Sequence, residues 1–495
     1  MNSLLTSFIA LLVFLLFYIL HHRKSQNATT VPIHRSFDPF TAFDVQLKNH
    51  FDLKSLVRQH GHHGTTFQLT PIATTPIIYT ISPENIKKIM TNGNDFGVEP
   101  LRGESMGPFC GRGFLTSDGD AWMASRRMLK PCFGKKYIED MTDLNIGVER
   151  LAEKIQRAGD IVDLQPLLFD MFLDASFKFL LGTDGKDDDL GNKDPPYSRA
   201  QFLTAFDSGL LGTGIRIMLG SYRFLVPSSG YLKTCRSVHE WLEYFIRIQM
   251  EGATDTTLPN DATPGQKSSM AHNLGGQTDD LEYIRGQVLQ SMLASKETTA
   301  VLISNAVFLL ARHPAIWQTL REEILQHPNR DDLFTFDGLT TFAFLQNILK
   351  EALRLYPVFP LNGRIALRDT SLPTSPSPTD RQTTRSQSVP VPKGSTIVMS
   401  FYTLHRNQNV FGSDVESFNP YRWSTIHPTQ YEFMPFGGGQ RACLGREKSQ
   451  AEAALVIARL AERFERLESK DVREFKPQTG ISTCNGNGCK VALYS

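Results

Sequence analysis

The sequence is poor in cysteine, and its positive and negative charges nearly cancel. Its six cysteines are widely scattered along 495 residues, which is not the dense spacing of a disulfide-stapled secreted domain. Lys and Arg number 52 against 51 Asp and Glu, for a net charge of +1, so nothing in the charge indicates a nucleic-acid partner. With 41% hydrophobic and 21% charged residues, the chain is able to bury a sizeable core. This balance fits the binding of small molecules better than the binding of a polyanionic partner.

Two kinds of motif are missing as well. No internal repeat is visible, and no Gly-x-Gly-x-x-Gly stretch follows a strand and opens a helix, so the chain has no flavin or nicotinamide module of its own. Cys484 and Cys489 stand in a Cys-x4-Cys arrangement without a second Cys or His pair nearby. Because a structural zinc site uses four such ligands, we expect ordinary loop thiols there.

The N-terminus carries the longest uncharged apolar run. Residues 3–20 read SLLTSFIALLVFLLFYIL, and as a helix they would span ~27 Å, which suits a thin endoplasmic-reticulum bilayer. His21, His22, Arg23 and Lys24 follow directly, so the positive-inside bias places the remaining chain in the cytosol. The alternative is a cleaved signal peptide, but the basic n-region and the A-x-A-like site are missing. We predict a single-pass anchor at 3–20 and a tether at 21–36.

The periodicity beyond the tether is chiefly helical. Residues 65–81 alternate apolar and β-branched side chains and predict a small strand pair. Two polar stretches, 252–277 and 370–388, read as exposed insertions in one catalytic domain of residues 37–495. The predicted fold class is mainly α with a minor β-sheet part, and the predicted helices are 145–157, 166–181, 236–250, 279–312 and 314–326.

A cysteine near the C-terminus stands in a glycine-rich segment that precedes a helical stretch. The segment FGGGQRACLG resembles the cytochrome P450 haem loop, Phe-x-x-Gly-x-Arg-x-Cys-x-Gly, at Phe436, Gly439, Arg441, Cys443 and Gly445. A lone cysteine is more often a buried, inert thiol, but five matching positions favour a function. Glycines let the backbone approach a flat macrocycle, and amides at the start of a helix stabilise a thiolate.

The resemblance implies a cytochrome P450 fold with haem b, whose iron takes an axial thiolate from Cys443. A thiolate ligand pushes electron density onto the iron and favours O–O cleavage, which indicates oxygen activation. The resemblance further implies that Arg441 contacts a haem propionate and that Phe436 packs against the sulfur-facing side of the ring.

Upstream segments match the same family in the family's order. Glu351 and Arg354 in LKEALRLYP form a Glu-x-x-Arg pair, and PYRW supplies Arg422. Alone, such a pair is usually an exposed ion pair. The resemblance instead implies a buried structural network of the three residues, which is costly to break because buried charge would be left unpaired.

Three further residues match haem-binding positions of the family. Trp122 and Arg126 stand four apart in WMASR, and Arg364 follows the Glu-x-x-Arg helix in PLNGRIALRD. Residues four apart share one helix face. The resemblance implies that all three contact propionates together with Arg441, and guanidinium groups are well suited to bind carboxylates.

The segment ASKETT, residues 294–299, resembles the family's oxygen-activating helix segment. Glu297 and Thr298 occupy its acid and alcohol positions, and such a pair in a mid-helix groove is able to relay protons to a buried haem face. Ser295 stands where the family usually has Gly. We expect its hydroxyl to bond back to a carbonyl one turn earlier and to bend the helix.

From about Phe37 to the end, the chain resembles the fungal branch that hydroxylates alkanes and fatty acids and tailors secondary metabolites. The resemblance implies a monooxygenase acting with O2 on a lipophilic small molecule, with electrons from an NADPH-cytochrome P450 reductase. The basic docking face for this reductase is predicted at Lys130, Lys135, Lys136, Arg446 and Lys448. The alternatives are a haem-thiolate isomerase or dehydratase without net oxygenation, and a non-enzymatic membrane haem protein.

Overall fold

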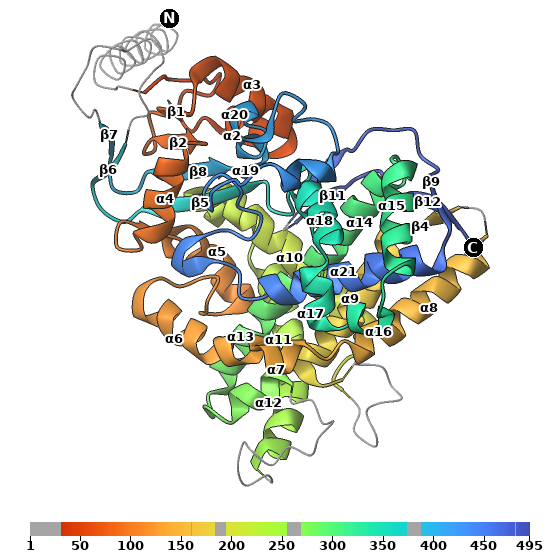
Figure 1. Cartoon of the computed structure of the whole chain (residues 1–495). Helices are drawn as coiled ribbons and strands as arrows, with labels where there is room; N and C mark the ends of the chain where they lie inside the picture. The colour runs from red at the N-terminus through yellow and green to blue at the C-terminus, as the bar shows by residue number, and fades with distance from the viewer. Residues whose placement is uncertain (1–30, 160, 184–194, 255–268, 374–387, 481) are drawn as a thin grey trace, which may run out of the picture. The chain divides into compact units, whose positions relative to one another are not determined.

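Helices dominate the computed structural model, and the strands form small sheets (Figure 1), which confirms the predicted mainly α class. The structure describes residues 31–159, 161–183, 195–254, 269–373, 388–480 and 482–495. The predicted anchor at 3–20 and most of the tether lie outside these residues. So do the central parts of both predicted insertions.

The chain divides into two compact units that are each built from discontinuous segments. The sheet unit comprises, in its described part, residues 31–97, 359–373, 388–415 and 427–442. The helical unit comprises the described residues of Val98–Val358, Glu416–Ile426 and Cys443–Ser495. The predicted catalytic domain at 37–495 draws on both units, and its boundaries stay a prediction.

The sheet unit contains a five-stranded sheet in the order β1-β2-β8-β5-β3. The predicted strand pair at 65–81 is confirmed, because β1 and β2 pair in antiparallel register. The pairing of β2 with β8 is parallel, and the other three pairings are antiparallel. The strands are β1 Thr66–Leu69, β2 Ile77–Thr80, β3 Phe96–Gly97, β5 Leu361–Ala366 and β8 Thr396–Ser400.

Helices and one hairpin complete this unit. Helix α4 starts where the Ser82 side chain accepts a hydrogen bond from the Asn85 amide and Pro83 occupies the first turn. Its apolar face packs in one buried cluster with Ile397 and Met399 of β8. The remaining elements are α2 Phe43–Phe51, α3 Leu53–His63, α4 Pro83–Thr91, β6 Thr370–Pro373, β7 Ser388–Val391, α19 Phe401–Leu404, α20 Gln408–Phe411 and the 3-10 turn η5 Gly439–Arg441.

The helical unit is organised around α14, which spans Thr298–Leu310. Every residue of α14 after Thr298 is buried, as expected for a helix that is apolar on all sides. It packs against α9, α18 and α21. The helices of this unit are α5 Glu99–Cys110, α6 Gly119–Leu129, η1 Lys130–Phe133, α7 Lys135–Ile138, α8 Thr142–Ala158, α9 Leu164–Leu181, α10 Arg199–Leu219, η3 Gly220–Leu225, α11 Ser229–Thr254, α12 Met270–Gly275, α13 Leu281–Ser295, α14, α15 Pro314–Leu325, α16 Arg330–Leu333, α17 Phe336–Thr341, α18 Ala343–Leu355, η4 Pro420–Ser424 and α21 Arg446–Arg463.

Short strands close the C-terminal part of the helical unit. Strands β4 Val162–Asp163, β12 Lys490–Tyr494 and β9 Arg466–Ser469 form one sheet, and β10 Pro477–Thr479 pairs with β11 Thr483–Asn485. Strand β11 packs against α14. This packing places the residues just before β11 beside the start of the core helix.

Two boundary predictions need correction. The predicted helix at 279–312 is divided, because α13 ends at Ser295 and α14 begins at Thr298. The predicted insertions are too long, since α11 continues to Thr254, α12 lies within 252–277, and β6 and β7 pair within the ends of 370–388. Polar neighbours in the sequence hid these elements, although Met270 and Leu274 of α12, Leu372 of β6 and Val389 of β7 are buried in hydrophobic clusters.

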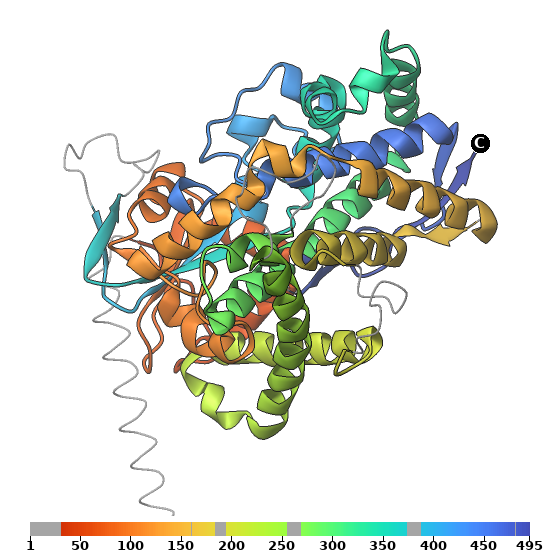
Figure 2. The ribbon, with the colours of Figure 1, turned by 90° about the horizontal axis from the view of Figure 1, so that it is seen from below.

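Among the described residues, two helical stretches are long and apolar enough to cross a bilayer, Arg199–Leu219 and Leu281–Leu310. The second is mostly buried inside the protein, so its apolar character serves the core. The first is mostly unburied. Figure 2 shows that the turn formed by the end of α10, η3 and the start of α11 lies at the periphery of its unit.

Candidate active site

Cys443 lies in the helical unit, three residues before α21 begins at Arg446. It is the one exposed cysteine of the six, of which Cys110, Cys132, Cys235 and Cys489 are buried and Cys484 is intermediate. The following Leu444 packs with Phe133 against the core of the unit. The cysteine is thus fixed by its neighbours while its own side chain stays open, which suits a ligand for a bound group and not a core thiol.

Three groups bear on the protonation of Cys443. Many protein atoms lie around Cys443 although its own surface stays open, and the resulting desolvation, the largest cause, raises the pKa of the thiol. The Gly445 amide, which donates a hydrogen bond to it, and the positive charges of Arg126 and Arg446 lower the pKa in opposition. The free thiol is therefore favoured without a metal, whereas a coordinated metal ion deprotonates a thiol outright. The site fits iron, because the amide and the two cations are already placed to stabilise the thiolate.

Arg126 connects this cysteine to the tryptophan that the sequence singled out. Both Trp122 and Arg126 lie on α6, with Trp122 buried and the Arg126 guanidinium 5.8 Å from the centre of its ring. Burial lowers the pKa of Arg126, while the charge of Cys443 raises it. Three of the predicted haem-binding residues thus come together in the helical unit.

The three consecutive glycines of the cysteine loop, residues 437–439, lie in the sheet unit, where two of them have left-handed backbones. Gly437 has φ +68° and Gly439 has φ +64°. A Cβ atom at Gly439 would overlap the carbonyl oxygen of Met90, and one at Gly438 would lie 2.7 Å from Cε of Met434. The loop therefore runs so close to α4 that only glycine fits at Gly439, whereas at Gly438 the flexible end of Met434 would have to move.

Met90 also contacts the predicted propionate residue of the sheet unit. Arg364 is buried on β5, and its guanidinium donates to Asn362 Oδ1 at 2.7 Å, to the Gly363 carbonyl at 2.9 Å and to Met90 Sδ at 3.4 Å. Arg441 lies in η5, which packs against α4. Since Met90 touches both Arg364 and the glycine loop, α4 brings the sheet unit's predicted haem-binding residues, Phe436 included, to one region.

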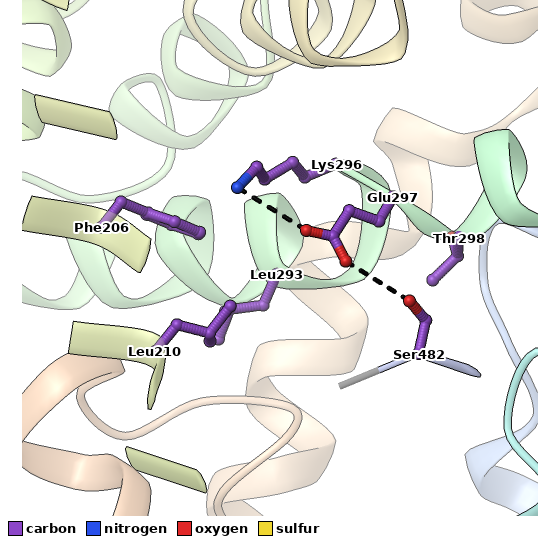
Figure 3. Close-up of a pocket in the computed structure, with 7 residues that line it drawn as sticks. All are labelled: Phe206, Leu210, Leu293, Lys296, Glu297, Thr298 and Ser482. Atoms are coloured by element: carbon purple, nitrogen blue, oxygen red, sulfur yellow. Dashed lines mark hydrogen bonds and ion pairs between the residues drawn. The ribbon is translucent and has the colours of Figure 1, made fainter. Parts of the chain in front are cut away.

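The acid and the alcohol flank the break between α13 and α14. One carboxylate oxygen of Glu297 lies 3.6 Å from Lys296 Nζ, and the other accepts a hydrogen bond from Ser482 Oγ at 3.3 Å. Lys296 Nζ also donates to Asp207 of α10 at 2.6 Å. Figure 3 shows the Glu297 carboxylate directed toward Lys296 and Ser482 rather than toward Thr298. The acid is thus held by groups from both sides of a small cavity.

The hydroxyl groups at this break differ from the prediction. We expected Ser295 to bond back to a carbonyl, but its buried Oγ has no hydrogen-bond partner among the described residues. Thr298 Oγ1 donates instead to the Ala294 carbonyl at 2.7 Å. The prediction of a hydrogen bond from Ser295 is wrong, and it is Thr298 that bonds back to a carbonyl one turn earlier.

The cavity at the break is lined by Phe206, Leu210, Leu293, Lys296, Glu297, Thr298 and Ser482 (Figure 3). Apolar residues of α10 line one side of the cavity, and residues at the break between α13 and α14 line another. Its volume of about 10 Å³ accommodates the centre of about one water molecule. The polar groups in it are the predicted acid and alcohol together with Lys296 and Ser482.

Glu351 lies at the centre of a fully buried network in the helical unit. Its carboxylate accepts from Arg354 Nε and Nη2 at 2.9 and 2.8 Å, from Arg422 Nε at 2.9 Å, from the Asn419 amide at 3.0 Å and from Trp423 Nε1 at 3.0 Å. The Glu351 and Arg354 side chains are 0% exposed and Arg422 is 5% exposed. This network joins α18 to η4.

The sequence did not point to several residues of these sites. Lys296, Ser482 and Met90 are common residue types with no motif signal, and their partners lie 89, 185 and 274 positions away. Trp423 had a signal, because it directly follows the matched Arg422 in PYRW. The family match alone would have been enough to find it.

Comparison with known proteins shows the family to which the chain belongs. The family model described as Cytochrome P450 matches residues 40–487. Cytochrome P450 52A13 of Debaryomyces hansenii is 32% identical over 432 residues, which cover 84% of this chain and 82% of that protein. The cytochrome P450 monooxygenase fsdH of Fusarium heterosporum is 32% identical over 454 residues, with 89% and 78% covered. Cytochrome P450 52A3-B of Candida maltosa is 34% identical over 438 residues, with 83% and 80% covered.

The chain belongs to the cytochrome P450 family, a family of haem-thiolate iron enzymes. Its function is accordingly that of a haem-thiolate monooxygenase, an oxidoreductase. The alternatives of an isomerase, a dehydratase or a non-enzymatic haem protein are not favoured, since similar proteins such as fsdH are named monooxygenases.

Proposed function

We propose that this chain hydroxylates a lipophilic small molecule at the endoplasmic-reticulum membrane, with electrons from an NADPH-cytochrome P450 reductase. One atom of O2 enters the substrate and the other leaves as water, with two electrons from NADPH and two protons. The observation that carries the proposal is the open Cys443 thiol between the Gly445 amide, Arg126 and Arg446 at the start of α21.

The roles of the cofactor-binding residues follow from their charge. A haem held by the Cys443 thiolate supplies redox-active iron for oxygen activation. We assign Arg126, Arg364 and Arg441 to its propionates, since guanidinium groups bind carboxylates in a two-pronged manner, and Trp122 to the same propionates through its single indole N–H. We assign Phe436 to packing against the macrocycle. Glu351, Arg354 and Arg422 are proposed to have a structural role, because the Glu351 carboxylate is already surrounded by hydrogen-bond donors of the protein itself.

Glu297 and Thr298 are the proposed proton-handling residues. Glu297 is within hydrogen-bond reach of Ser482 and lies at a cavity with room for about one water. A carboxylate in this position is able to take a proton from the Lys296 side and pass it through the water toward Thr298. Thr298 donates its own hydrogen to Ala294, so its free lone pairs are left to accept a hydrogen bond and hold a proton donor in place.

The substrate class is proposed from the apolar walls of the same cavity. Phe206, Leu210 and Leu293 line it beside the break. The cavity itself has room for about one water molecule, so it is the apolar character of these walls, and not the volume, that favours a lipophilic ligand at this site. The resemblance to the fungal alkane and fatty-acid hydroxylases fits this choice. Apolar walls of this kind are equally compatible with a role in secondary-metabolite biosynthesis and with a role in fatty-acid and alkane oxidation.

Membrane association is supported by an exposed apolar surface of the helical unit. Large apolar side chains that stand open to solvent gather at the end of α10, in η3 and at the start of α11. Exposed apolar patches rimmed by polar residues are typical of membrane contact. The apolar run at 3–20 would add a single-pass anchor with the enzyme in the cytosol. The residues of this surface are Leu211, Ile215, Met218, Tyr222, Phe224, Leu225 and Leu232.

Docking of the reductase is proposed at the basic residues near Cys443 in the helical unit. Lys130, Lys136 and Arg446 are exposed, and the packing of Phe133 against Gly445 brings η1 beside the start of α21. Lys135 pairs with Asp337 and Lys448 with Glu452, so these two contribute less free charge. Rim charges of this kind mainly accelerate association.

The test is a reconstituted reaction. The full-length chain, an NADPH-cytochrome P450 reductase and a panel of fatty acids, alkanes, polyketides and terpenoids are combined in phosphatidylcholine nanodiscs. We expect NADPH and O2 consumption to rise with one substrate class and a product heavier by one oxygen atom, and Cys443→Ser to abolish both. A product isomeric with the substrate and formed without O2 consumption would contradict the proposal, as would release of the chain from membranes by alkaline carbonate.

A further inference from the structure

A groove of about 500 Å³ opens in the sheet unit, between the first described segment, α2 and α3. Three cationic side chains and three imidazoles line it, namely Arg35, Lys48, Arg58, His34, His62 and His63. Among the described residues that line the groove, none is acidic. The edge of the groove is fixed, because the chain at Ile33 forms a parallel bridge with Gln68 of β1.

The imidazoles are clustered tightly. His34 Nδ1 and His63 Nε2 share a hydrogen bond of 3.0 Å, and the ring centres of His62 and His63 are 4.6 Å apart. Burial lowers the pKa of His34 and His63, and the nearby positive charges lower it further, including Lys48 in the case of His34. The one opposing group is Asp44, which also accepts hydrogen bonds from Ser36 and Phe37. Because these pKa values are lowered, the neutral form of the imidazoles is favoured at neutral pH. The positive charge that would stabilise a bound anion comes from Arg35 and Lys48.

The floor of the groove offers a buried hydroxyl. Ser55 is 2% exposed, and its Oγ accepts a hydrogen bond from Gln59 Nε2 at 3.0 Å. Gln59 is held in turn by reciprocal hydrogen bonds with Asn49. The Ser55 hydroxyl hydrogen has no acceptor among the described residues, so it remains available to a ligand in the groove. Hydroxyl, guanidinium and imidazole donors together suit a phosphate group.

A metal ion fits less well. Within the described chain, no group of three or more His, Cys, Asp or Glu residues is placed to hold one. Arg35, Lys48 and Arg58 would also repel a cation. Arg58 is partly neutralised by Asp52 at 2.6 Å, which leaves Arg35 and Lys48 as the open positive charges.

Exposed aromatic side chains accompany the groove. Phe37 is fully exposed two residues after Arg35, and Phe51 is exposed three residues after Lys48 on α2. Residues three apart lie on one helix face. Basic groups with exposed aromatic side chains are typical of the membrane interface and not of a site for a soluble ion. Val31 is 11 positions after Leu20, so the apolar run at 3–20 would hold the groove within ~40 Å of the bilayer.

We propose that this groove binds the phosphate of an anionic phospholipid headgroup, with Arg35, Lys48 and the Ser55 hydroxyl as donors. The inference rests on the membrane location proposed above. A site of this kind would select the lipid that surrounds the enzyme and would orient the sheet unit at the bilayer surface.

The test measures lipid binding to the full-length chain in mild detergent. Native mass spectrometry counts adducts of phosphatidic acid and of phosphatidylcholine on the wild type, on R35Q/K48Q and on the control K54Q/K87Q. The control removes two exposed lysines of the same unit that do not line the groove. We expect phosphatidic acid to bind in preference, its affinity to fall roughly 30-fold in R35Q/K48Q, and the control to change less than about 3-fold.

Three results would overturn the inference. Equal losses of phosphatidic-acid affinity in both variants would mean that the lipid is bound by non-specific surface charge. Unchanged affinity in R35Q/K48Q would mean that the groove is not the site. Displacement of the lipid by an equal concentration of inorganic phosphate would mean a soluble oxyanion site. Monooxygenase turnover of R35Q/K48Q with a reductase separates this failure from failure of the proposed function, because we expect that turnover to persist.

Discussion

Replacement of Glu351 by alanine tests the buried network most severely. The carboxylate accepts two hydrogen bonds from Arg354 and one each from Arg422, Asn419 and Trp423. Arg354 is 0% exposed, so the protein offers it no water in place of the lost partner. The alanine variant would leave two guanidinium groups buried beside each other without their shared counter-ion.

The magnitude follows from that burial. Removal of one partner of a buried ion pair costs about 3–5 kcal/mol, because an uncompensated buried charge remains. A whole domain is stabilised by only about 5–15 kcal/mol, so the variant should lose a large share of its stability. Glu351→Gln keeps the volume but points an amide N–H₂ at donors, so we expect a loss of similar size.

The measurement is guanidinium-induced unfolding followed by far-ultraviolet circular dichroism. The control is Glu153→Ala, which breaks an ion pair with Arg157 whose side chains are 54% and 79% exposed. Such a pair is worth less than about 0.5 kcal/mol, so its midpoint should stay near that of the wild type. A Glu351→Ala midpoint no lower than the control's would refute the reasoning that burial makes this network costly to break.

Three further predictions concern single residues. Burial lowers the pKa of His60 from 6.5 to about 4, and its Nε2 has no partner among the described residues. As the pH falls below 6.5, the unfolded chain therefore binds a proton at this histidine before the folded chain does. The folded state should lose roughly 3 kcal/mol of stability between pH 7.5 and 4. In His60→Gln the unfolding midpoint should fall less steeply as the pH is lowered than in the wild type. An unchanged pH dependence would argue against a buried neutral His60. Gly439→Ala meets the Met90 carbonyl whereas Gly437→Ala meets nothing within 4 Å at a similar φ. Both should lose about 1 kcal/mol from the left-handed backbone, and Gly439→Ala should lose more, together with bound haem by absorbance, because its Cβ atom overlaps backbone. Thr298→Ala should divert NADPH electrons to hydrogen peroxide, while Thr298→Ser should not; equal peroxide from the two would exclude a role for the hydroxyl.

Local patterns predicted the parts of the fold that depend on neighbours in sequence. The alternation at 65–81 predicted β1 and β2 because a half-buried strand needs that period. The helical period at 279–312 predicted a helix for the same kind of reason, although the structure divides it into α13 and α14. The parallel partner of β2 could not be predicted in this way, because β8 lies more than 300 residues further along the chain.

The site was predicted unevenly for a related reason. The cysteine loop is a contiguous motif, so Cys443 and its glycines could be named from ten residues of sequence. Burial of the Glu351–Arg354 pair is a tertiary property, since the same spacing also suits an exposed helix. The partners of Glu297 were missed because Lys296 is tied to α10 and Ser482 enters from beside β11, and neither contact leaves a local signal.

The most direct test of the central claim is the reduced carbon-monoxide spectrum of the full-length chain and of Cys443→Ser. Thiolate ligation of haem iron gives this spectrum a long-wavelength band that other protein ligands do not give. We predict the band in the wild type, its loss in Cys443→Ser and its retention in Cys484→Ser, which removes a cysteine that is only partly exposed. A band that survives in Cys443→Ser would contradict the assignment of Cys443 as the iron ligand.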